Sequence, residues 1–258
     1  MLDAILAESR RRAAELERPT VSSTSSEPRS PSFADAIRGR SALSVIAEFK
    51  RRSPSAGRLS TDTDASEQLD RVQAYVTGGA AAISVLTEPS EFGGSTEDLR
   101  AVSNALPSTP ILRKDFLVDP RQCVESRALG ASAVLLIAQC LGRSQLIELY
   151  DAARSVGLDV LVECHDRVEC EVALELRNAI LGINNRNLRD LSVDTSRTNS
   201  LLSTIPDDRV VVAESGYSDA QSVDAIRGRA DAVLVGSALM RSEDPARVVR
   251  SIGGGHER

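Results

Sequence analysis

Eight short apolar segments recur along most of this chain, and they constrain its fold more than any other feature. They are rich in Val, Ile and Leu, and polar residues seldom interrupt them. Their ranges are 44–49, 81–86, 110–114, 133–138, 158–163, 179–184, 209–214 and 231–236. Continuous apolar runs of this length are typical of strands buried on both faces of a parallel sheet. The sequence therefore predicts a parallel sheet of eight strands.

Stretches with helical character separate these segments. Residues 64–79 begin with an Asp that can cap a helix and end in Gly. Ser144 and Gly157 bound a second expected helix in the same way, and residues 218–230 repeat the design. Strands that alternate with helices form βα units, and eight such units predict an α/β fold, the (β/α)8 TIM barrel. An open doubly wound sheet is the alternative, but no GxGxxG follows the first strand to support a dinucleotide crevice.

The residues before the first strand predict an N-terminal helical extension over 1–43. Residues 2–18 form an amphipathic pattern that Pro19 ends, and a Ser-rich connector separates it from a short helix at 32–40. We expect residues 44–252 to form the barrel, which is the catalytic domain, and residues 253–258 to form a disordered tail.

Composition and charge exclude several functions. The net charge is −6 over 258 residues, whereas a protein that binds nucleic-acid backbone needs a basic face. The apolar runs are far shorter than the roughly 20 residues that span a membrane. The N-terminus carries an acid before its apolar residues and basic residues after them, which is the wrong order for a secretory signal.

The cysteines indicate a reducing compartment. They form no CxxC pair and no metal-ligand spacing, at Cys123, Cys140, Cys164 and Cys170. We interpret them as reduced structural thiols of a cytoplasmic protein, and we predict no metal site.

Polar residues stand where the apolar segments end, and in a barrel the chemistry lies at the carboxyl ends of the strands. These polar residues are Glu48, Lys50, Lys114, Glu163, Asn184, Glu214, Ser215 and Ser237, with Gly216 and Gly236 beside the two serines. Successive side chains of a strand alternate between faces, so Glu48 and Lys50 point the same way. Burying these charges is costly unless they pair. Ion pairs that only hold the rim are the structural interpretation, and a catalytic site built from several strands is the functional one.

The last two strand ends predict a phosphate site. Ser215-Gly216 and Gly236-Ser237 place small residues and backbone N–H groups where the chain is expected to enter a helix. Such N–H groups and the helix dipole bind anions, and barrels often hold a phosphate after strands seven and eight.

One long motif resembles a known family. Residues 46–57, IAEFKRRSPSAG, resemble the signature of the indole-3-glycerol phosphate synthase family. Further matches follow in order: TEPSEFGGS at 87–95, PILRKDFLVDPRQ at 110–122, LVECHD at 161–166, GINNRNL at 182–188, VAESGYS at 212–218 and VLVGSALMR at 233–241. The resemblance covers nearly everything from Ser44 to Arg241, and the helix ahead of the barrel matches too.

The resemblance implies a carbon–carbon lyase of tryptophan biosynthesis. The family converts 1-(2-carboxyphenylamino)-1-deoxyribulose 5-phosphate to indole-3-glycerol phosphate with loss of CO2 and water, and it uses no cofactor or metal. By motif, Lys114 resembles the general acid that protonates the carbonyl oxygen, and Glu163 resembles its partner base. Lys50 resembles a lysine that contacts the substrate's charged groups and is the alternative acid. Burial would lower the pKa of such a lysine and neighbouring glutamates would raise it, and the sequence leaves that balance open.

The remaining positions carry over by motif as groups. Glu48, Asn184 and Glu214 resemble the polar shell that orients the substrate. Ser215 is predicted to be one of the catalytic residues. The phosphate site of the family is resembled by Ser215 together with Gly216, Gly236, Ser237 and the nearby Ser55. Phe92, Phe116 and Leu135 resemble the apolar walls that hold the anilino ring in the family. The expected partner is therefore a small phosphorylated substrate, with no nucleic acid and no membrane, and the expected state is a monomer or weak homo-oligomer.

Two other functions stay open at this point. A sister phosphosugar barrel such as phosphoribosylanthranilate isomerase would share the phosphate end, but typically uses an Asp/Cys pair and lacks the loop at 46–57. A non-catalytic barrel could bind a phosphorylated ligand or a partner protein. His165 follows Glu163 closely, but the sequence shows no partner for it, so we predict no direct role for it.

Overall fold

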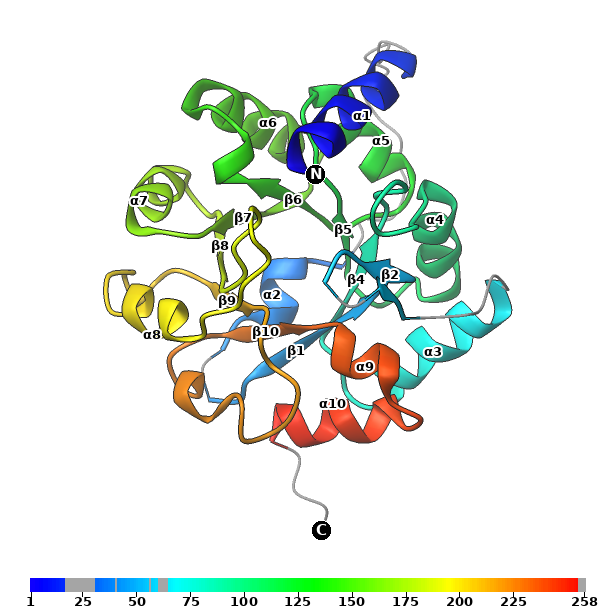
Figure 1. Ribbon diagram of the computed structural model, residues 1–258, viewed down its shortest axis with the longest axis vertical. Helices are drawn as coiled ribbons and strands as arrows, with labels where there is room; N and C mark the ends of the chain where they lie inside the picture. The colour runs from blue at the N-terminus through cyan, green and yellow to red at the C-terminus, as the bar shows by residue number, and fades with distance from the viewer. Residues whose placement is uncertain (17–30, 40, 56, 60–64, 255–258) are drawn as a thin grey trace.

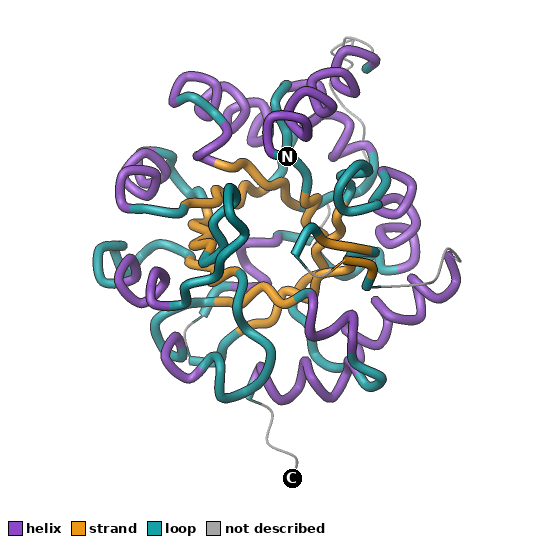
Figure 2. The backbone as a smooth tube through the Cα atoms, in the orientation of Figure 1, coloured by secondary structure: helices purple, strands orange, loops and turns teal. Residues whose placement is uncertain are grey.

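The eight predicted strands form a closed parallel barrel (Figure 1, Figure 2). The computed structural model describes residues 1–16, 31–39, 41–55, 57–59 and 65–254. The barrel strands are β1 (Ser44–Phe49), β4 (Ala82–Leu86), β5 (Ile111–Lys114), β6 (Ala133–Ile137), β7 (Asp159–Cys164), β8 (Ile180–Asn184), β9 (Val211–Glu214) and β10 (Ala232–Val235). β1 pairs with both β4 and β10, which closes the ring. The predicted TIM barrel is confirmed, and closure rules out the open sheet.

Strand register brings the polar strand ends to one level. Asn184 lies opposite Glu214, and Lys114 lies opposite Leu86 at the end of the neighbouring strand. Because all eight strands run the same way, their carboxyl ends share one mouth of the barrel. Side chains from distant parts of the sequence therefore meet there.

Helices surround the barrel (Figure 2). They are α1 (Leu2–Glu15), α2 (Phe33–Ile37), α3 (Ala65–Thr77), α4 (Thr96–Ala105), α5 (Pro120–Ala128), α6 (Arg143–Ser155), α7 (Arg167–Glu175), α8 (Ser196–Leu202), α9 (Ser237–Arg241) and α10 (Pro245–Gly253), with short 3-10 turns η1 (Ala138–Cys140) and η2 (Asp224–Ile226). A small hairpin, β2 (Arg52–Ser53) and β3 (Gly57–Arg58), follows β1. Among the described helices, none is both long and apolar enough to cross a membrane.

The short helix α2 closes the end of the barrel opposite the polar mouth. Its Phe33 and Ile37 are fully buried. The backbone N–H of Ala34 donates to Asp159, at the start of β7, and that of Gly39 donates to Asp231, just before β10. Figure 1 shows α2 at the centre of the ring of strands. The predicted second helix is therefore present.

Two expectations about helices need correction. The helix expected from Ser144 begins at Arg143 with Gly142 as its N-cap, although Gly157 follows its end with φ 79° as predicted. The expected helix at 218–230 is absent apart from η2. Local hydrogen bonds among Ser218, Asp219 and Ser222 hold a turn there, and short polar side chains of this kind compete with helix formation.

The structure describes only part of the N-terminal extension and of the C-terminal tail. α1 ends at Glu15, and the predicted stop at Pro19 lies outside the described residues, as does the Asp64 cap. α10 includes Gly253, the first residue of the predicted tail, and residues 255–258 are not described. The disordered tail thus stays a prediction.

Candidate active site

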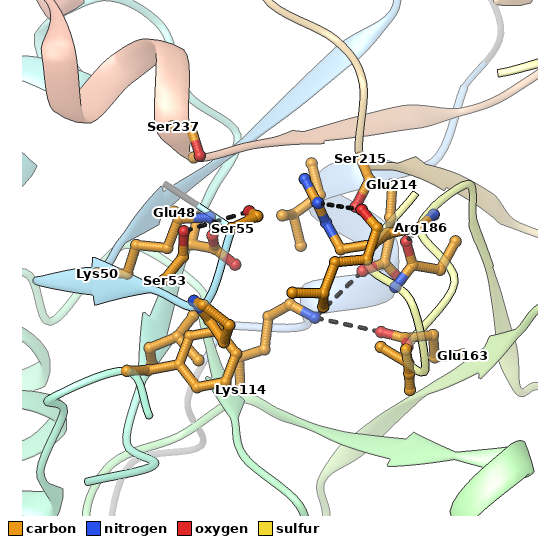
Figure 3. Close-up of a pocket in the computed structure, with 18 of the residues that line it drawn as sticks. Glu48, Lys50, Ser53, Ser55, Lys114, Glu163, Arg186, Glu214, Ser215 and Ser237 are labelled. Atoms are coloured by element: carbon orange, nitrogen blue, oxygen red, sulfur yellow. Dashed lines mark hydrogen bonds and ion pairs between the residues drawn. The ribbon is translucent and has the colours of Figure 1, made fainter. Parts of the chain in front are cut away.

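The carboxyl ends of the strands open into a cavity of about 370 Å³, a size that suits a small ligand. Every residue that the sequence predicts for the site lines this cavity. These are Glu48, Lys50, Ser55, Phe92, Lys114, Phe116, Leu135, Glu163, Asn184, Glu214, Ser215, Gly216, Gly236 and Ser237. Figure 3 shows the labelled charged side chains turned toward one another. The predicted site residues are therefore brought together.

Lys114 lies between two buried glutamates (Figure 3). Its Nζ is 3.3 Å from Oε2 of Glu163 and 3.3 Å from Oε2 of Glu214. Lys114 ends β5, whereas the two carboxylates come from β7 and β9. Both glutamates are almost completely buried, so their attraction to the ammonium is weakly screened by solvent.

The charges around Lys114 decide whether its pKa is lowered by burial or raised by neighbouring glutamates, which the sequence leaves open. Burial alone would lower the pKa of Lys114, but Glu214 and Glu163 raise it above its ordinary value. Burial raises the pKa of Glu214 to about 7 despite the opposing effect of Lys114. Burial also opposes ionisation of Glu163, yet Lys114 and His165 hold its pKa below the ordinary value. At neutral pH, Glu163 is thus a carboxylate, whereas Glu214 holds a proton far more readily than Glu163 does.

The second lysine forms a separate pair with its own strand neighbour. Lys50 directly follows β1, and its Nζ is 2.6 Å from Oε1 of Glu48, as expected for two side chains that point the same way at a strand end. A Cβ at Gly236 would lie 2.3 Å from Glu48 Oε1 and 2.9 Å from Lys50 Nζ. Gly236 therefore leaves room for this pair, in addition to its predicted place in the phosphate site.

The turn after β9 has a strained backbone. Ser215 adopts φ 64°, and Gly216 follows with φ 91°; a positive φ is uncommon for a residue other than glycine. The buried amide of Asn185 supports this turn by donating to the Ser215 carbonyl at 3.0 Å and to the Tyr217 hydroxyl at 3.2 Å. Strain of this kind clusters at functional sites.

The phosphate prediction needs one correction at these turns. Irregular chain, rather than a helix, follows Gly216. Gly236 does precede a helix, but α9 has only five residues. The helix dipole therefore contributes less than expected, and an anion here would rely on N–H and hydroxyl groups.

Apolar side chains cover the other side of the cavity. The rings of Phe92 and Phe116 are 6.4 Å apart between centroids and tilted by 33°, a favourable aromatic arrangement. Leu135 of β6 is buried and also lines the cavity. The site thus combines an apolar wall with a charged wall.

Comparison with known proteins decides which family has this arrangement. The family model described as Indole-3-glycerol phosphate synthase matches residues 2–252. The chain belongs to the indole-3-glycerol phosphate synthase family. This membership decides against the isomerase and the non-catalytic barrel.

Curated relatives named indole-3-glycerol phosphate synthase match over most of their length. The Nocardioides sp. protein is 50% identical over 212 residues, which is 82% of this chain and 80% of the relative. The Opitutus terrae protein is 42% identical over 258 residues, 95% of each chain. Among solved structures, the tryptophan synthase alpha subunit of Legionella pneumophila has a TM-score of 0.62 at 12% identity, covering 86% of this chain and 95% of that one. That likeness concerns the fold alone.

The cavity of this family member is also lined by residues that the sequence does not predict. Arg186 lines the cavity, and its Nη1 donates to the Leu191 carbonyl at 2.9 Å. Its position two residues after Asn184 in the GINNRNL motif is the signal that could have found it. Met1, Leu2 and Ile5 of α1 also line the cavity. No local pattern shows that this helix folds back over the mouth.

Proposed function

We propose that Lys114 and Glu163 carry out the reaction of the indole-3-glycerol phosphate synthase family in this chain, with Lys50 contacting the charged groups of the substrate. That reaction converts 1-(2-carboxyphenylamino)-1-deoxyribulose 5-phosphate to indole-3-glycerol phosphate, CO2 and water. The observation that carries the assignment is the contact of one largely buried ammonium with two buried carboxyl groups of different pKa. Groups whose environments separate their pKa values in this way suit acid and base roles.

Lys114 acts on the ketone oxygen. As the aromatic carbon that bears the carboxylate attacks the ketone carbon, negative charge develops on that oxygen. A buried ammonium neutralises this charge and gives up a proton to it. The glutamates that raise the pKa of Lys114 keep it charged until the substrate arrives. The protonated lysine is thus already held in place as a proton donor before the substrate binds.

Glu163 acts in the later loss of water. The hydroxyl at the former ketone carbon leaves with a second proton, while the neighbouring carbon gives up a proton to form the indole double bond. A carboxylate that is ionised at neutral pH can take that proton. Because the substrate carboxylate leaves as neutral CO2, two protons enter and one is released, so each turnover consumes one proton.

The remaining residues hold the substrate. Lys50 faces its charged groups together with the polar side chains Glu48, Asn184 and Glu214. The turns at Ser215-Gly216 and Gly236-Ser237, with Ser55, bind the phosphate, and Phe92, Phe116 and Leu135 bind the anilino ring. Ring closure needs a folded substrate, so this positioning accounts for much of the rate.

Two features of the structure support the expected setting of the enzyme. All four cysteines are free thiols, and Cys123, Cys164 and Cys170 are buried, which suits a reducing cytoplasm. Among the described residues, the exposed large apolar side chains are scattered. This supports a monomer or weak homo-oligomer.

The decisive experiment adds the carboxyphenylamino-deoxyribulose phosphate to purified protein without metal or nucleotide. Indole fluorescence should appear, with uptake of one proton per product in weak buffer. Lys114→Met should lower kcat by about 1,000-fold or more while the protein still folds. Arg143→Met, which removes an exposed cation outside the cavity, is the matched control. A Lys114→Met enzyme as active as the wild type would remove Lys114 from the mechanism.

A further inference from the structure

A chain of three side chains leads from Glu163 to the edge of the barrel. His165 Nε2 is 3.4 Å from Oε1 of Glu163, and His165 Nδ1 is 3.2 Å from Oε2 of Glu169. The backbone N–H of His165 also donates to Glu169 Oε2 at 2.7 Å. Glu163 lies on β7 and Glu169 on α7, so the histidine links the catalytic strand to the helix that follows it.

The inner contact joins two atoms that are otherwise unsatisfied. Glu163 Oε1 and His165 Nε2 are both buried, and within the described residues neither has a hydrogen-bond partner. The other oxygen of Glu163 faces Lys114. A buried polar atom without a partner is costly, so both atoms gain when the ring nitrogen carries a proton toward the carboxylate.

Both ring nitrogens face carboxylate oxygens, and a neutral imidazole has only one N–H to donate. Only the imidazolium can donate to Glu163 and Glu169 together. We propose that His165 is a positioning residue that, as an imidazolium anchored by Glu169, holds the carboxylate of Glu163 in its catalytic orientation and ionised state. The proposal rests on the assignment of Glu163 as the base.

The charged groups that face this ring favour the imidazolium. Burial lowers the pKa of His165, but the hydrogen bond to Glu169 and the charges of Glu163, Glu169 and Glu214 together raise it. The Cys140 thiol lies on η1. Burial and the charges of Glu163 and Glu169 raise its pKa to about 12, so the thiol is uncharged at neutral pH.

Asp166 and Lys114 are the other charged groups next to this contact. Asp166 is turned to the start of α7, where its Oδ1 accepts from the Glu169 N–H. Lys114, on β5, meets the opposite oxygen of Glu163. The carboxylate of Glu163 is thus held between two cations, one on each oxygen.

A merely structural histidine would affect folding, whereas a positioning histidine affects the titration of Glu163. His165→Asn places an amide where Nδ1 lies and keeps a partner for Glu169, but it cannot reach Glu163. His165→Gln places an amide near Nε2 and can still donate to Glu163. The pair therefore separates the anchor from the catalytic contact.

The kinetic test compares these variants across pH. His165→Asn should lower kcat about 10- to 100-fold with a smaller change in KM. It should also move the acidic limb of the kcat/KM profile to higher pH, because Glu163 has lost one of its two cations. His165→Gln should recover part of kcat. A His165→Asn enzyme with the wild-type kcat and pH profile would overturn the proposal.

A second measurement does not depend on activity. The chain has only two histidines, so His256→Ala leaves His165 as the single imidazole signal in an NMR titration. Glu163→Gln in this background should lower the pKa of His165 by about one unit or more, and Glu169→Gln should lower it as well. A ring pKa unmoved by Glu163→Gln would refute the contact. If the contact is present but the wild-type enzyme forms no indole product, the proposed function fails and the ion pair stands.

Discussion

At the scale of single residues, the site depends on missing side chains as well as on charged ones. Gly182 lies opposite Glu163 in the β7–β8 register, and a Cβ there would lie 2.3 Å from Glu214 Oε1. Gly236 leaves the same kind of space beside Glu48. A carboxylate can therefore turn into the barrel mouth only because the adjacent strand carries a glycine at that level.

Gly182→Ala should test this packing directly. The new methyl group displaces the flexible end of Glu214 from Lys114, so we expect kcat to fall about tenfold or more, with little loss of stability. Steady-state kinetics and thermal unfolding measure the two effects. Gly253→Ala, where a Cβ meets only ordinary contacts at 3.8 Å, should keep wild-type kinetics. Equal activity of the two variants would show that Glu214 does not need its present position.

Ser237→Asp tests the phosphate site at one residue. Ser237 begins α9 at the cavity edge, and a carboxylate there would repel the substrate phosphate. We expect KM to rise about tenfold or more while kcat changes less. Ser237→Asn, the neutral match in shape, should raise KM far less. An unchanged KM in Ser237→Asp would place the phosphate elsewhere in the cavity.

The sequence predicts the two lysines and three glutamates of the cavity, but it misses Arg186 and does not reveal which groups carry a proton. Each predicted charge follows an apolar run, so its position at a strand end is visible in the sequence. Which of burial and pairing controls the pKa of Lys114 depends on Glu163 and Glu214, which lie 49 and 100 residues further along the chain. The contact of His165 with Glu169 likewise depends on how β7 meets α7.

At the scale of elements, the two N-terminal helices lie at opposite ends of the barrel, and α1 is tied to the end of β5. Arg12 pairs with Asp115 through two hydrogen bonds of 2.9 and 2.8 Å. Asp115, which directly follows Lys114, also accepts from Thr87 at 2.7 Å. Burial opposes ionisation of Asp115, yet Arg12 and Arg113 hold its pKa well below the ordinary value.

Arg12→Met should loosen α1 from the barrel. The buried carboxylate of Asp115 loses its bidentate partner, which we expect to cost about 1–3 kcal/mol of unfolding free energy. KM should also rise, because α1 places Leu2 and Ile5 on the cavity wall. Arg11→Met is the matched control, since Arg11 is 60% exposed and, within the part of the chain that the structure describes, pairs with Glu8 and Glu15 of its own helix. A loss of stability equal in both variants would contradict the anchoring role.

Element bounds follow from sequence where packing and local preference agree. The eight strand ranges are predicted to within two residues because each strand is buried on both faces. The failure at 218–230 has the opposite cause, since side-chain hydrogen bonds of Ser218, Asp219 and Ser222 favour a turn over the helix that the pattern suggests. The fold of α1 over the mouth depends on the distant Asp115, which no local pattern reveals.

At the scale of the whole molecule, the barrel supports a site that works against its own stability. Glu163 and Glu214 are buried at the mouth beside the largely buried Lys114, and burying ions is costly even when they are paired. The two glutamates bear this cost differently. Relative to the unfolded chain, the pKa of Glu163 is lowered and that of Glu214 is raised.

This difference predicts opposite effects of two similar substitutions on stability. A group with a lowered pKa stabilises the fold above its ordinary pKa of 4.5, so Glu163→Gln should destabilise the protein at pH 8. A group with a raised pKa stabilises the fold at low pH, and that stabilisation is lost as the pH rises through about 7. Glu214→Gln should therefore stabilise the protein at pH 8, by up to about 3 kcal/mol, and much less at pH 5.

Urea unfolding of both variants at pH 5 and pH 8 measures these free energies, and kcat gives the functional side. Both variants should lose activity, since each removes a partner of Lys114. A Glu214→Gln protein that is more stable and less active than the wild type would show that the fold accepts a loss of stability to keep this carboxyl group ionisable near neutral pH. If both substitutions destabilise the protein equally at pH 8, the two glutamates do not differ in protonation as the structure indicates.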